Sequence, residues 1–445
     1  MPNIRLKTEI PGPNSRALMA RRLNALPRGV YASTPLFVRH AEGAILEDVD
    51  GNRFIDLGGG IGCTNVGHRN PRVLGALRSQ LDAFLHLCFQ VTGYESYVSL
   101  AEKLNQLTPG SFAKKTFLVN SGAEAVDNAV KIARAFTGRT AVLSVEDGFH
   151  GRTMMGLSLT SKTHPYKRGF GPFLADVYRI PYGVPANNRL SSREPMTKGQ
   201  VNELLDQTFR RVVAAESVAA IVVEPVLGEG GFVVPPAGFL PALVEICRER
   251  GIVFIADEVQ TGFGRTGELF ASKHFAIEPD LILTAKSLGG GLPLAAITGR
   301  AEIMDAPGPG GLGGTFGGNP ASCAAALAVL EELADGKLLA RARSLGEQFQ
   351  RRAAAWRRRH AFIADVRGVG AMQAMEFVDA KAVKKLLHHC LQNGVLVLNA
   401  GTYDNVVRLL MPLTITDEEF NQALQVLEDG LSNVAIEPRE LAAVK

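Results

Sequence analysis

One lysine in the sequence stands where a short apolar run ends and three glycines begin. It is Lys286, in the stretch L-T-A-K-S-L-G-G-G at 283–291. At the end of a strand, a lysine is most often a surface cation whose stem covers apolar neighbours. The alternative is a lysine that bonds covalently to a carbonyl compound and also moves protons, with the glycines giving its backbone room. Other motifs have to decide between the two.

A carboxylate ends a second apolar run. Asp257 follows I-V-F-I-A, and Gln260 lies three residues further on. A buried carboxylate is costly unless it meets a cation or takes up a proton. A structural salt bridge would satisfy Asp257. The protonated ring nitrogen of pyridoxal phosphate would serve equally, because a carboxylate there makes that ring a better electron sink. Gln260 could then bind the phenolic oxygen of the ring.

The turn V-N-S-G-A-E-A at 119–125 joins an apolar run to a helical one. The free N–H groups and the positive dipole end of such a helix make a cradle for phosphate. A dinucleotide site would require G-x-G-x-x-G with an acidic residue about twenty positions later. This turn has a single glycine. The pattern therefore favours a cradle for a phosphate group over a nicotinamide dehydrogenase.

A further motif, D-G-F-H-G-R-T at 147–153, brings an aromatic ring, an imidazole and a guanidinium together. Alone, Phe149 is typical of a core residue and Arg152 of a surface charge. In combination with the other motifs they meet the needs of an aldehyde cofactor: an amine, a carboxylate, phosphate donors and a flat group against the ring. The combination favours a covalent role for Lys286.

Strands and helices alternate from about Asn65 onward, which predicts a largely parallel sheet covered by helices. Such a sheet binds ligands outside the carboxyl ends of its strands. Several polar residues lie at the ends of predicted strands, at that edge, namely Ser121, Glu224, Asp257 and Lys286. Strands are expected at Lys115–Val119, Thr140–Val145, Ala219–Glu224, Ile252–Asp257, Leu281–Thr284 and Ala295–Thr298, and helices at Glu124–Phe136 and Leu240–Arg250.

Two other elements precede this region. A short helix is expected to begin with a cap at Asn14 or Ser15 and to end at Leu26, before a proline. The alternating stretch A-I-L-E-D-V-D-G-N-R-F-I-D-L predicts a β-hairpin around Asp50-Gly51. After the sheet, the glycine-rich run at 308–319 separates a final segment of helices and short strands.

The bulk properties of the 445-residue chain narrow the function classes. A net charge of +4 is too small to argue for nucleic acid or an anionic membrane as a partner. Five cysteines without a C-x-x-C pair favour reduced thiols, and no metal site is expected. The N-terminus lacks the apolar core of a signal peptide, and no apolar run is long enough to span a bilayer. We therefore expect a cytoplasmic protein.

With these motifs, the sequence resembles the class III, or ω-amino-acid, aminotransferases, a pyridoxal 5'-phosphate-dependent family of fold type I. Within that family it is most similar to the bacterial enzymes that act on 4-aminobutyrate. The similarity runs from about Leu18 to Leu431. The densest motifs are P-R-G-V at 27–30, C-F-Q-V at 88–91, F-H-G-R-T at 149–153, E-P-V-L-G-E-G-G-F at 224–232, I-A-D-E-V-Q-T-G-F-G-R-T-G at 255–267 and A-K-S-L-G-G-G-L-P-L-A at 285–295.

The resemblance implies a role for each cofactor residue. Lys286 would form the Schiff base and move the substrate proton, and Asp257 would hold the pyridine nitrogen. Gln260 would bind the phenolic oxygen, while Phe149 would stack on the ring. The remaining cofactor-binding residues are expected to be Ser121, Gly122, Ala123, His150, Glu224 and, from the neighbouring subunit, Thr315.

The resemblance also places the substrate. Ile61 and Arg152 would lie beside it, with Arg152 binding the distal carboxylate, and Glu229 and Arg408 would form a removable ion pair. Two departures from the family pattern affect these expectations. Ala123 stands where serine is frequent, which removes a hydroxyl donor, and Leu227 stands where glutamine is common, which leaves the fine substrate preference open. No iron–sulfur cluster is expected, because none of the five cysteines is near the phosphate turn.

The fold that the resemblance implies has a large domain with a mostly parallel, seven-stranded sheet and a smaller α+β domain. Residues 1–64 and 326–445 would form the small domain and residues 65–325 the large one. A homodimer or a dimer of dimers is expected, with Thr315 reaching the neighbouring active site.

The implied reaction is transamination of 4-aminobutyrate, or a similar ω-amino acid, with 2-oxoglutarate. It would give succinate semialdehyde and glutamate by a ping-pong mechanism through pyridoxamine phosphate. The same scaffold also fits 5-aminovalerate or acetylornithine transamination, dialkylglycine decarboxylation and amino-acid racemisation. An NAD-dependent dehydrogenase or a non-catalytic binding protein would share only the sheet, and the pairing of Asp257 with Lys286 argues against both.

Overall fold

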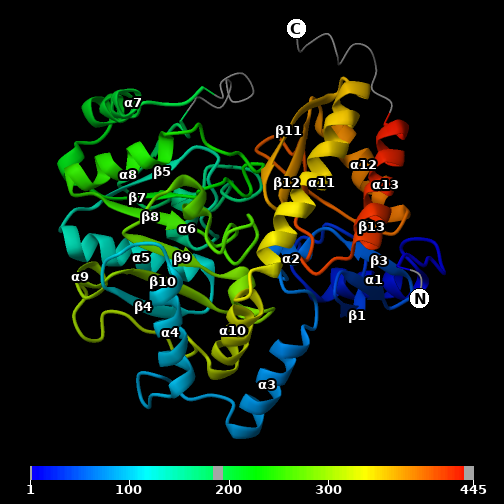
Figure 1. Ribbon diagram of the computed structural model, residues 1–445, viewed down its shortest axis with the longest axis horizontal. Helices are drawn as coiled ribbons and strands as arrows, with labels where there is room; N and C mark the ends of the chain where they lie inside the picture. Colours follow the sequence, from blue (N-terminus) through cyan, green and yellow to red (C-terminus); the bar gives the residue numbers. More distant parts are fainter. Residues whose placement is uncertain (1–2, 184–193, 435–445) are drawn as a thin grey trace.

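A computed structural model describes residues 3–183 and 194–434 of the chain. Its centre is a seven-stranded sheet with the order β4-β10-β9-β8-β7-β5-β6 (Figure 1). All its neighbouring strands pair in parallel except β10, which runs antiparallel to both β4 and β9. The mostly parallel sheet is therefore confirmed. The strands are β4 Lys114–Val119, β5 Ala141–Val145, β6 Val177–Ile180, β7 Val218–Val223, β8 Val253–Asp257, β9 Leu281–Thr284 and β10 Ala295–Arg300.

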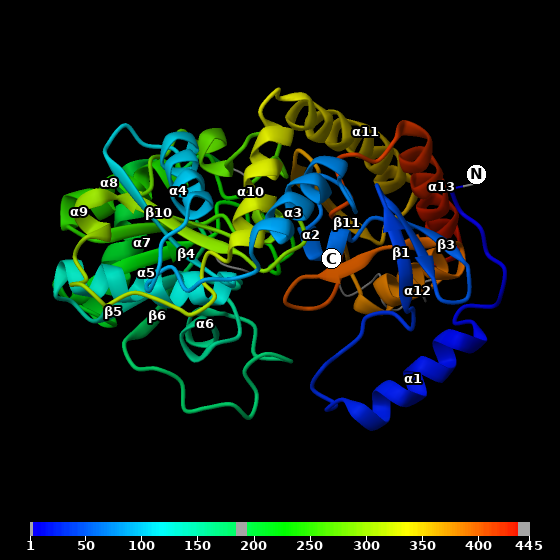
Figure 2. The same cartoon turned by 90° about the horizontal axis from the view of Figure 1, so that it is seen from below.

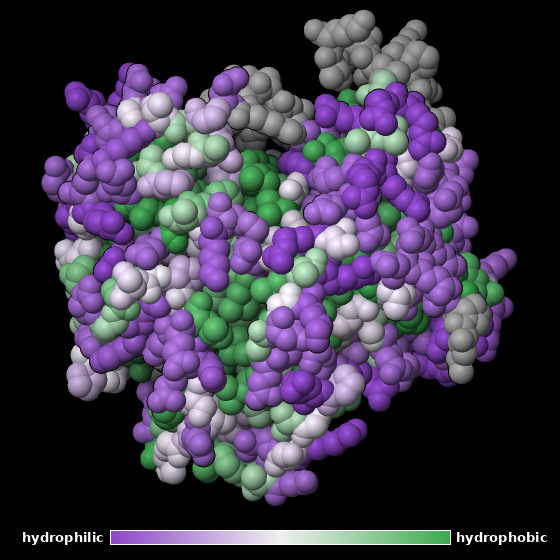
Figure 3. Space-filling model, viewed as in Figure 1, coloured by the Kyte–Doolittle hydropathy of each residue, from purple (hydrophilic) through white to green (hydrophobic). Residues whose placement is uncertain are grey.

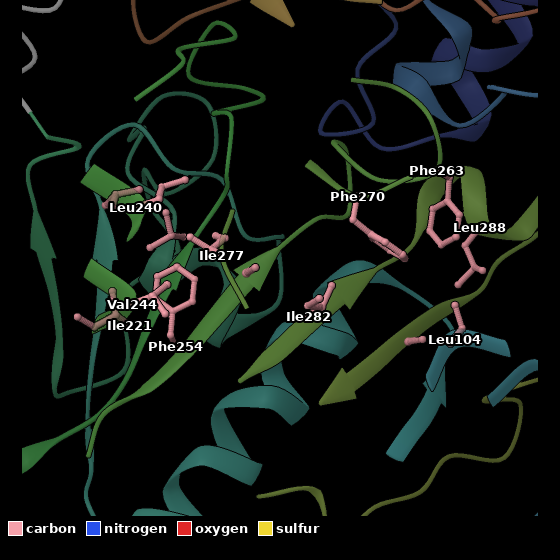
Figure 4. Close-up of a cluster of buried hydrophobic side chains, with 14 of the residues drawn as sticks. Leu104, Ile221, Leu240, Val244, Phe254, Phe263, Phe270, Ile277, Ile282 and Leu288 are labelled. Carbon is pink, nitrogen blue, oxygen red and sulfur yellow. The ribbon is translucent and has the colours of Figure 1, made fainter. Parts of the chain in front are cut away.

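The central strands are apolar along their whole length because helices cover both faces of the sheet. On β7, Ile221 belongs to one buried cluster, while its neighbours Ala220 and Val222 belong to another on the opposite face. Phe254 and Ile282 continue the first cluster on β8 and β9, and they lie among other buried side chains in Figure 4. Successive side chains of a strand thus enter two separate cores.

Separate groups of helices cover the two faces of the large sheet. On one face α5 packs against β7, β8, β9 and β10, and α9 packs beside it. On the other, α8 packs against β8, α4 against β4, and α10 against α3 and α4. Their bounds are α3 Pro71–Ala83, α4 Glu95–Leu107, α5 Gly122–Thr137, α6 Met154–Leu159, α7 Lys198–Arg211, α8 Phe239–Arg250, α9 Ala301–Met304 and α10 Pro320–Leu333, with 3₁₀ turns at Ala215–Ser217, Ala271–Phe275 and Lys286–Gly289.

A second unit lies beside the large sheet and contains both early and late parts of the chain (Figure 1). One of its sheets has the order β1-β2-β3-β13, so the predicted hairpin pairs with a strand from the C-terminal region. The other has the order β11-β12-β15-β14. The strands are β1 Val38–Glu42, β2 Ile45–Asp48, β3 Arg53–Asp56, β11 Ile363–Val369, β12 Met372–Phe377, β13 Val395–Leu396, β14 Leu398–Ala400 and β15 Val406–Leu409.

A separate hydrophobic core holds this small unit together. It joins Ile55 and Leu57 near the N-terminus to Trp356, Phe377 and Phe420. The covering helices are α11 Lys337–Arg359, α12 Ala380–Gln392 and α13 Asp417–Asn433, and the short helix α2 is Gly59–Gly62. The predicted domain bounds at 64/65 and 325/326 stay a prediction. Helix α10 runs through position 325 and packs on the large unit.

The first helix corrects one prediction. Helix α1, Pro13–Ala25, begins after Gly12, so Asn14 and Ser15 lie inside it and neither is its cap. The carboxylate of Asp50 accepts hydrogen bonds from the backbone N–H groups of Asn14, at 2.7 Å, and Ser15, at 2.9 Å. A residue from the β2–β3 hairpin therefore satisfies the free N–H groups of this helix, and local spacing could not reveal it. Figure 2 shows α1 at the edge of the molecule.

A buried arginine joins the two units. Arg265, in the turn after β8, donates hydrogen bonds to the backbone carbonyls of Met411, at 2.8 Å, and Leu410, at 3.1 Å, and to the side chain of Asn65. It is completely buried, and burial lowers the pKa of its guanidinium to about 9. The arginine therefore fixes the chain that follows β15 against the carboxyl edge of the large sheet.

Hydrophobic side chains also gather on the surface near the middle of the face drawn in Figure 3, where the two units meet. Within residues 3–183 and 194–434, no helix is long and apolar enough to cross a membrane. All five cysteines are free thiols. The same part of the chain holds no cluster of three or more His, Cys, Asp or Glu side chains arranged to bind a metal ion.

Candidate active site

A cavity of about 380 Å³ opens at the carboxyl ends of the sheet strands. Residues following β4, β5, β7, β8 and β9 meet there, as expected for a mostly parallel sheet. Most of the cofactor residues expected from the sequence line it. The lining consists of Cys63, Asn120, Ser121, Gly122, Ala123, Phe149, His150, Gly151, Glu224, Glu229, Asp257, Val259, Gln260, Ala285, Lys286 and Gly291–Leu294.

Lys286 reaches the cavity from a strained turn just after β9. Its backbone φ is 46°, a left-handed conformation that is uncommon outside glycine and often marks functional sites. Burial lowers the pKa of its ammonium group, although the nearby Glu229 carboxylate opposes that shift. A lowered pKa increases the share of neutral amine, the form of lysine that attacks a carbonyl carbon.

The glycines after Lys286 have a packing role that was not predicted from the sequence. Gly290 adopts a φ of 58°, and a Cβ atom there would lie 3.0 Å from Val329 on α10 and 3.2 Å from Val73 on α3. Gly291 adopts a φ of 107°. The turn thus needs glycine for positive φ and close helix packing, and the backbone room for a moving lysine stays a prediction.

Asp257 lies at the base of the cavity with His150 beside it. The Oδ2 atom of Asp257 is 2.8 Å from Nδ1 of His150, and its Oδ1 atom accepts a bond from the backbone N–H of Val259 at 3.2 Å. Both side chains are buried. Since an ionised carboxylate only accepts, Nδ1 of the imidazole carries the proton in this contact. The carboxylate is held rigidly while it still faces the cavity.

Glu224 is a second buried carboxylate, at the end of β7. It accepts hydrogen bonds from the backbone N–H groups of Phe149 and Gly228, both at 2.8 Å. It therefore orders the loop after β5, which carries Phe149 and His150, against the loop after β7. Burial raises the pKa of Glu224 to about 7, and the neighbouring Asp257 charge adds to this rise.

This raised pKa predicts a pH dependence of stability in the cofactor-free protein. Native Glu224 holds its proton up to about pH 7 and an unfolded glutamate only up to about 4.5. Its stabilising contribution is therefore complete below pH 4.5 and lost as the pH rises through 7, a change on the order of 3 kcal/mol. In Glu224→Gln, the urea midpoint should fall less between pH 5 and 7.5 than in the wild type. Equal falls in the two proteins would contradict the prediction.

The N-terminus of α5 forms one wall of the cavity. Ser121 caps this helix by accepting a hydrogen bond from the backbone N–H of Glu124 at 3.2 Å. A Cβ atom on Gly122 would lie 3.1 Å from Val259, so glycine keeps this approach open. Ala123 packs against Gly151, where a Cβ atom would come within 2.7 Å. The wall therefore offers free backbone N–H groups and few side chains, which suits an anion.

Two buried polar atoms of cavity-lining residues have no hydrogen-bond partner within the described part of the chain. They are Nε2 of His150 and Oε1 of Gln260. Buried polar atoms in native proteins are rarely left without a partner, and exceptions often mark a site that binds a further group. Gly228 leaves space for the Gln260 amide, because a Cβ atom there would lie 2.5 Å from Oε1.

An ion pair joins the cavity to the small unit. Nη1 of Arg408 on β15 donates to Oε1 of Glu229, and Arg408 is 5% exposed. Burial alone would raise the pKa of Glu229, but the charge and hydrogen bond of Arg408 lower it below the ordinary value. Glu229 is therefore ionised in this arrangement. The two residues that the resemblance paired are in contact, although 179 positions separate them.

Arg152, Ile61 and Thr315 lie outside the cavity lining. Arg152 is exposed, with its guanidinium carbon 4.6 Å from the ring centre of Tyr166. Ile61 is 45% exposed. Thr315 is also exposed, in the loop before α10. The contacts within one chain bring Arg152 toward the site through Tyr166, whereas Ile61 and Thr315 face solvent.

Several residues at the site were not predicted from the sequence. Cys63, Asn120 and Val259 line the cavity, and Tyr166 contacts both Arg152 and Glu229. Asn120 and Val259 adjoin residues that were singled out, so a search of immediate neighbours would have found them. Tyr166 lies in an irregular segment between α6 and β6, where no periodic pattern marks it.

Comparison with known proteins agrees with this geometry. The profile of the family described as aminotransferase class-III matches residues 28–431. The chain belongs to the class-III aminotransferases. It is 50% identical to a 4-aminobutyrate aminotransferase of Mycobacterium tuberculosis over 95% of this chain and 97% of that one. It is 44% identical to that of Escherichia coli over 93% and 97%, and 42% identical to a 5-aminovalerate aminotransferase of Pseudomonas aeruginosa over 95% and 99%.

Solved structures of other aminotransferases share the fold. An ornithine aminotransferase of Toxoplasma gondii, with PLP at its active site, aligns with a TM-score of 0.83 and 31% identity over 94% of both chains. An aminotransferase of Bacillus anthracis aligns with a TM-score of 0.87 and 28% identity over 95% of this chain and 99% of that one. The fold type I prediction is confirmed, and this class-III aminotransferase acts on an amino acid and a 2-oxo acid with pyridoxal 5'-phosphate as cofactor.

The cavity fits this cofactor. An amine, a buried carboxylate and the N-terminus of a helix converge on one space, and Nε2 of His150 and Oε1 of Gln260 lack partners there among the described residues. Glycine at 122 keeps the helix N-terminus open to a phosphate group. The amine would come from Lys286 and the carboxylate from Asp257.

Proposed function

We propose that this class-III aminotransferase moves the amino group of 4-aminobutyrate, or a similar ω-amino acid, to 2-oxoglutarate, giving succinate semialdehyde and glutamate by a ping-pong mechanism. Relatives named for 4-aminobutyrate at 44–50% identity support this substrate. The observation that carries the proposal is the Glu229–Arg408 ion pair, because a second cation that can be masked suits substrates with different numbers of carboxylates.

The proposed chemistry rests on a few side chains. When bound, pyridoxal 5'-phosphate supplies an electron sink for the charge left when a proton leaves the substrate carbon. The Lys286 amine would remove that proton in the first half-reaction, and in the second it would deliver a proton to the reacting carbon of the 2-oxo acid. The Asp257 carboxylate would hold a proton on the pyridine nitrogen, oriented by His150. Phe149 would cover one face of the ring, and Gln260 would bind its phenolic oxygen.

Substrate binding would use one arginine or two, depending on the number of carboxylates in the substrate. An ω-amino acid has one carboxylate, which Arg152 would bind at the exposed side of Tyr166. Glutamate and 2-oxoglutarate have a second carboxylate next to the reacting carbon, and Arg408 can bind it in bidentate fashion once Glu229 moves away. With an ω-amino acid bound, Glu229 would neutralise Arg408, whose charge is costly in a buried site.

The ion pair predicts opposite defects in two variants. Glu229→Ser leaves Arg408 uncompensated when an ω-amino acid binds, so the half-reaction with 4-aminobutyrate should slow far more than that with glutamate, by about tenfold or more in their ratio. Arg408→Ala removes the cation for the α-carboxylate, so it should impair the glutamate half-reaction more. Single-turnover absorbance measurements with each amino donor separate the two. Equal losses in both half-reactions for both variants would reject the switch.

The substrate is tested with a panel that includes 5-aminovalerate, because a 5-aminovalerate aminotransferase is 42% identical over nearly the whole chain. The panel comprises 4-aminobutyrate, 5-aminovalerate and N-acetylornithine, each assayed by glutamate formation from 2-oxoglutarate. We expect the highest kcat/KM with 4-aminobutyrate. A higher kcat/KM with 5-aminovalerate would change the proposed substrate to this amino acid, which is one methylene longer. Glutamate formation from N-acetylornithine alone would overturn the proposal.

We also propose a homodimer, or a dimer of dimers, in which Thr315 completes the phosphate site of the neighbouring subunit. Within one subunit Thr315 is exposed and outside the cavity. Large apolar side chains are exposed near it in the sequence and in the α3–α4 region, among them Phe316, Leu85 and Val91. Such side chains are typical of a surface that another subunit covers.

A further inference from the structure

Tyr166 stands between the two groups proposed to bind substrate carboxylates. Its hydroxyl donates to Oε2 of Glu229 at 3.3 Å, while the other oxygen of that carboxylate accepts from Arg408. Its ring covers the guanidinium of Arg152, 4.6 Å away, and lies 5.0 Å from the ring of Phe149. Tyr166 therefore contacts both Arg152, proposed to bind the first substrate carboxylate, and Glu229, the ion-pair partner of Arg408.

We propose that Tyr166 is a specificity-determining positioning residue, whose hydroxyl holds Glu229 against Arg408 and whose ring orients Arg152. The inference rests on the proposed function. Glu229 must break its bond to Tyr166 as well as its ion pair before Arg408 can bind a second carboxylate. The hydroxyl therefore shifts the site toward ligands with a single carboxylate, while the ring sets where that carboxylate binds.

The chemistry of the contact supports this role. Burial and the charge of Glu229 raise the pKa of Tyr166 to about 12, so the phenol donates its proton throughout the working pH range. A hydrogen bond to an ionised acceptor is stronger than one between neutral groups. Its loss from a half-buried position is expected to change a binding ratio by about tenfold. Stacking on an aromatic face further restricts the guanidinium of Arg152.

Two inert ligands measure the balance without turnover. Butyrate carries one carboxylate and glutarate two, so only glutarate requires a free Arg408. Calorimetric titration of the holoenzyme gives the two dissociation constants. In Tyr166→Phe, which keeps the ring and removes the hydroxyl, glutarate should gain about tenfold relative to butyrate. In Tyr166→Leu, which also removes the ring, both ligands should bind a few-fold more weakly than in Tyr166→Phe.

A matched control separates this effect from loss of any tyrosine hydroxyl. Tyr178 on β6 donates to the carboxylate of Asp176 at the same distance, 3.3 Å, but Asp176, unlike Glu229, does not line the cavity. Tyr178→Phe should leave the glutarate-to-butyrate ratio unchanged. In a Glu229→Ser background, Tyr166→Phe should also leave it unchanged, because the hydroxyl acts through Glu229.

The single-turnover half-reactions of the wild type and Tyr166→Phe complete the test. We expect the rate with glutamate to rise relative to that with 4-aminobutyrate in the variant, in step with the binding ratio. An unchanged or reversed ratio, or the same shift in the Glu229→Ser background, would overturn the role of Tyr166 and leave the proposed function intact. A wild type that reacts with no ω-amino acid would overturn the proposed function, and this inference with it.

Discussion

Lys286→Ala is expected to lose at least about 10⁴-fold in turnover, because this one side chain is proposed to supply both the amine that bonds to the cofactor and the base that moves the proton. The variant should still bind the cofactor, since the helix N-terminus, Asp257 and Gln260 remain. Borohydride treatment of the wild type should fix one pyridoxyl group per chain on Lys286. The same treatment of Lys286→Ala should fix none.

Lys273→Ala provides the matched control. Lys273 is an exposed lysine in the Ala271–Phe275 turn, outside the cavity lining. Its replacement should leave both labelling and turnover unchanged. Recovery of the label on another lysine by peptide mass mapping, or turnover within a factor of ten in Lys286→Ala, would refute the assignment of Lys286.

Asp257→Ala is expected to slow the proton-transfer step by about 10³-fold or more. The Asp257 carboxylate is buried beside His150 and would stabilise a positive charge on the cofactor ring. In a site with little water, such electrostatic stabilisation amounts to several kcal/mol. The rate is measured as the single-turnover decay of cofactor absorbance after mixing with amino donor. The loss should appear with every donor, because Asp257 is proposed to act on the cofactor and not on the substrate.

Asp257→Asn separates charge from packing. It nearly keeps the volume of the side chain and removes only the negative charge, so it should be nearly as slow as Asp257→Ala. If Asp257→Asn turns over near the wild-type rate while Asp257→Ala does not, the defect comes from a cavity in β8, and the ring nitrogen has another partner.

The large sheet could be predicted because its strands carry local signals. Strand β9, Leu281–Thr284, has the predicted bounds, and β8 begins one residue later than expected, at Val253. Buried strands read as continuous apolar runs, and turn residues mark their ends. The cap of α1 could not be predicted in this way, because Asp50 reaches it from another element.

The residues of the site also differ in whether a local sequence signal marks them. Lys286 and Asp257 could be identified from the sequence because they are polar residues at the ends of apolar runs. The contact of Glu229 with Arg408 came only from the resemblance, since the two lie on different units and no spacing rule links them. Tyr166 had neither signal. Its role depends on where an irregular segment lies relative to Glu229 and Arg152, and that arrangement is a property of the folded chain.

Arg408 comes from β15 of the small unit, whereas every residue proposed to hold the cofactor comes from the large one. The proposed contact to the α-carboxylate of the acceptor and the proposed cofactor site are thus encoded by separate stretches of the gene. We therefore expect mutations around β15 to change how the second carboxylate of the oxo acid is bound while the residues around Lys286 and Asp257 stay the same. Such an arrangement would let mutation, or laboratory recombination of related chains, change the pair of substrates while the residues of the reaction centre stay the same.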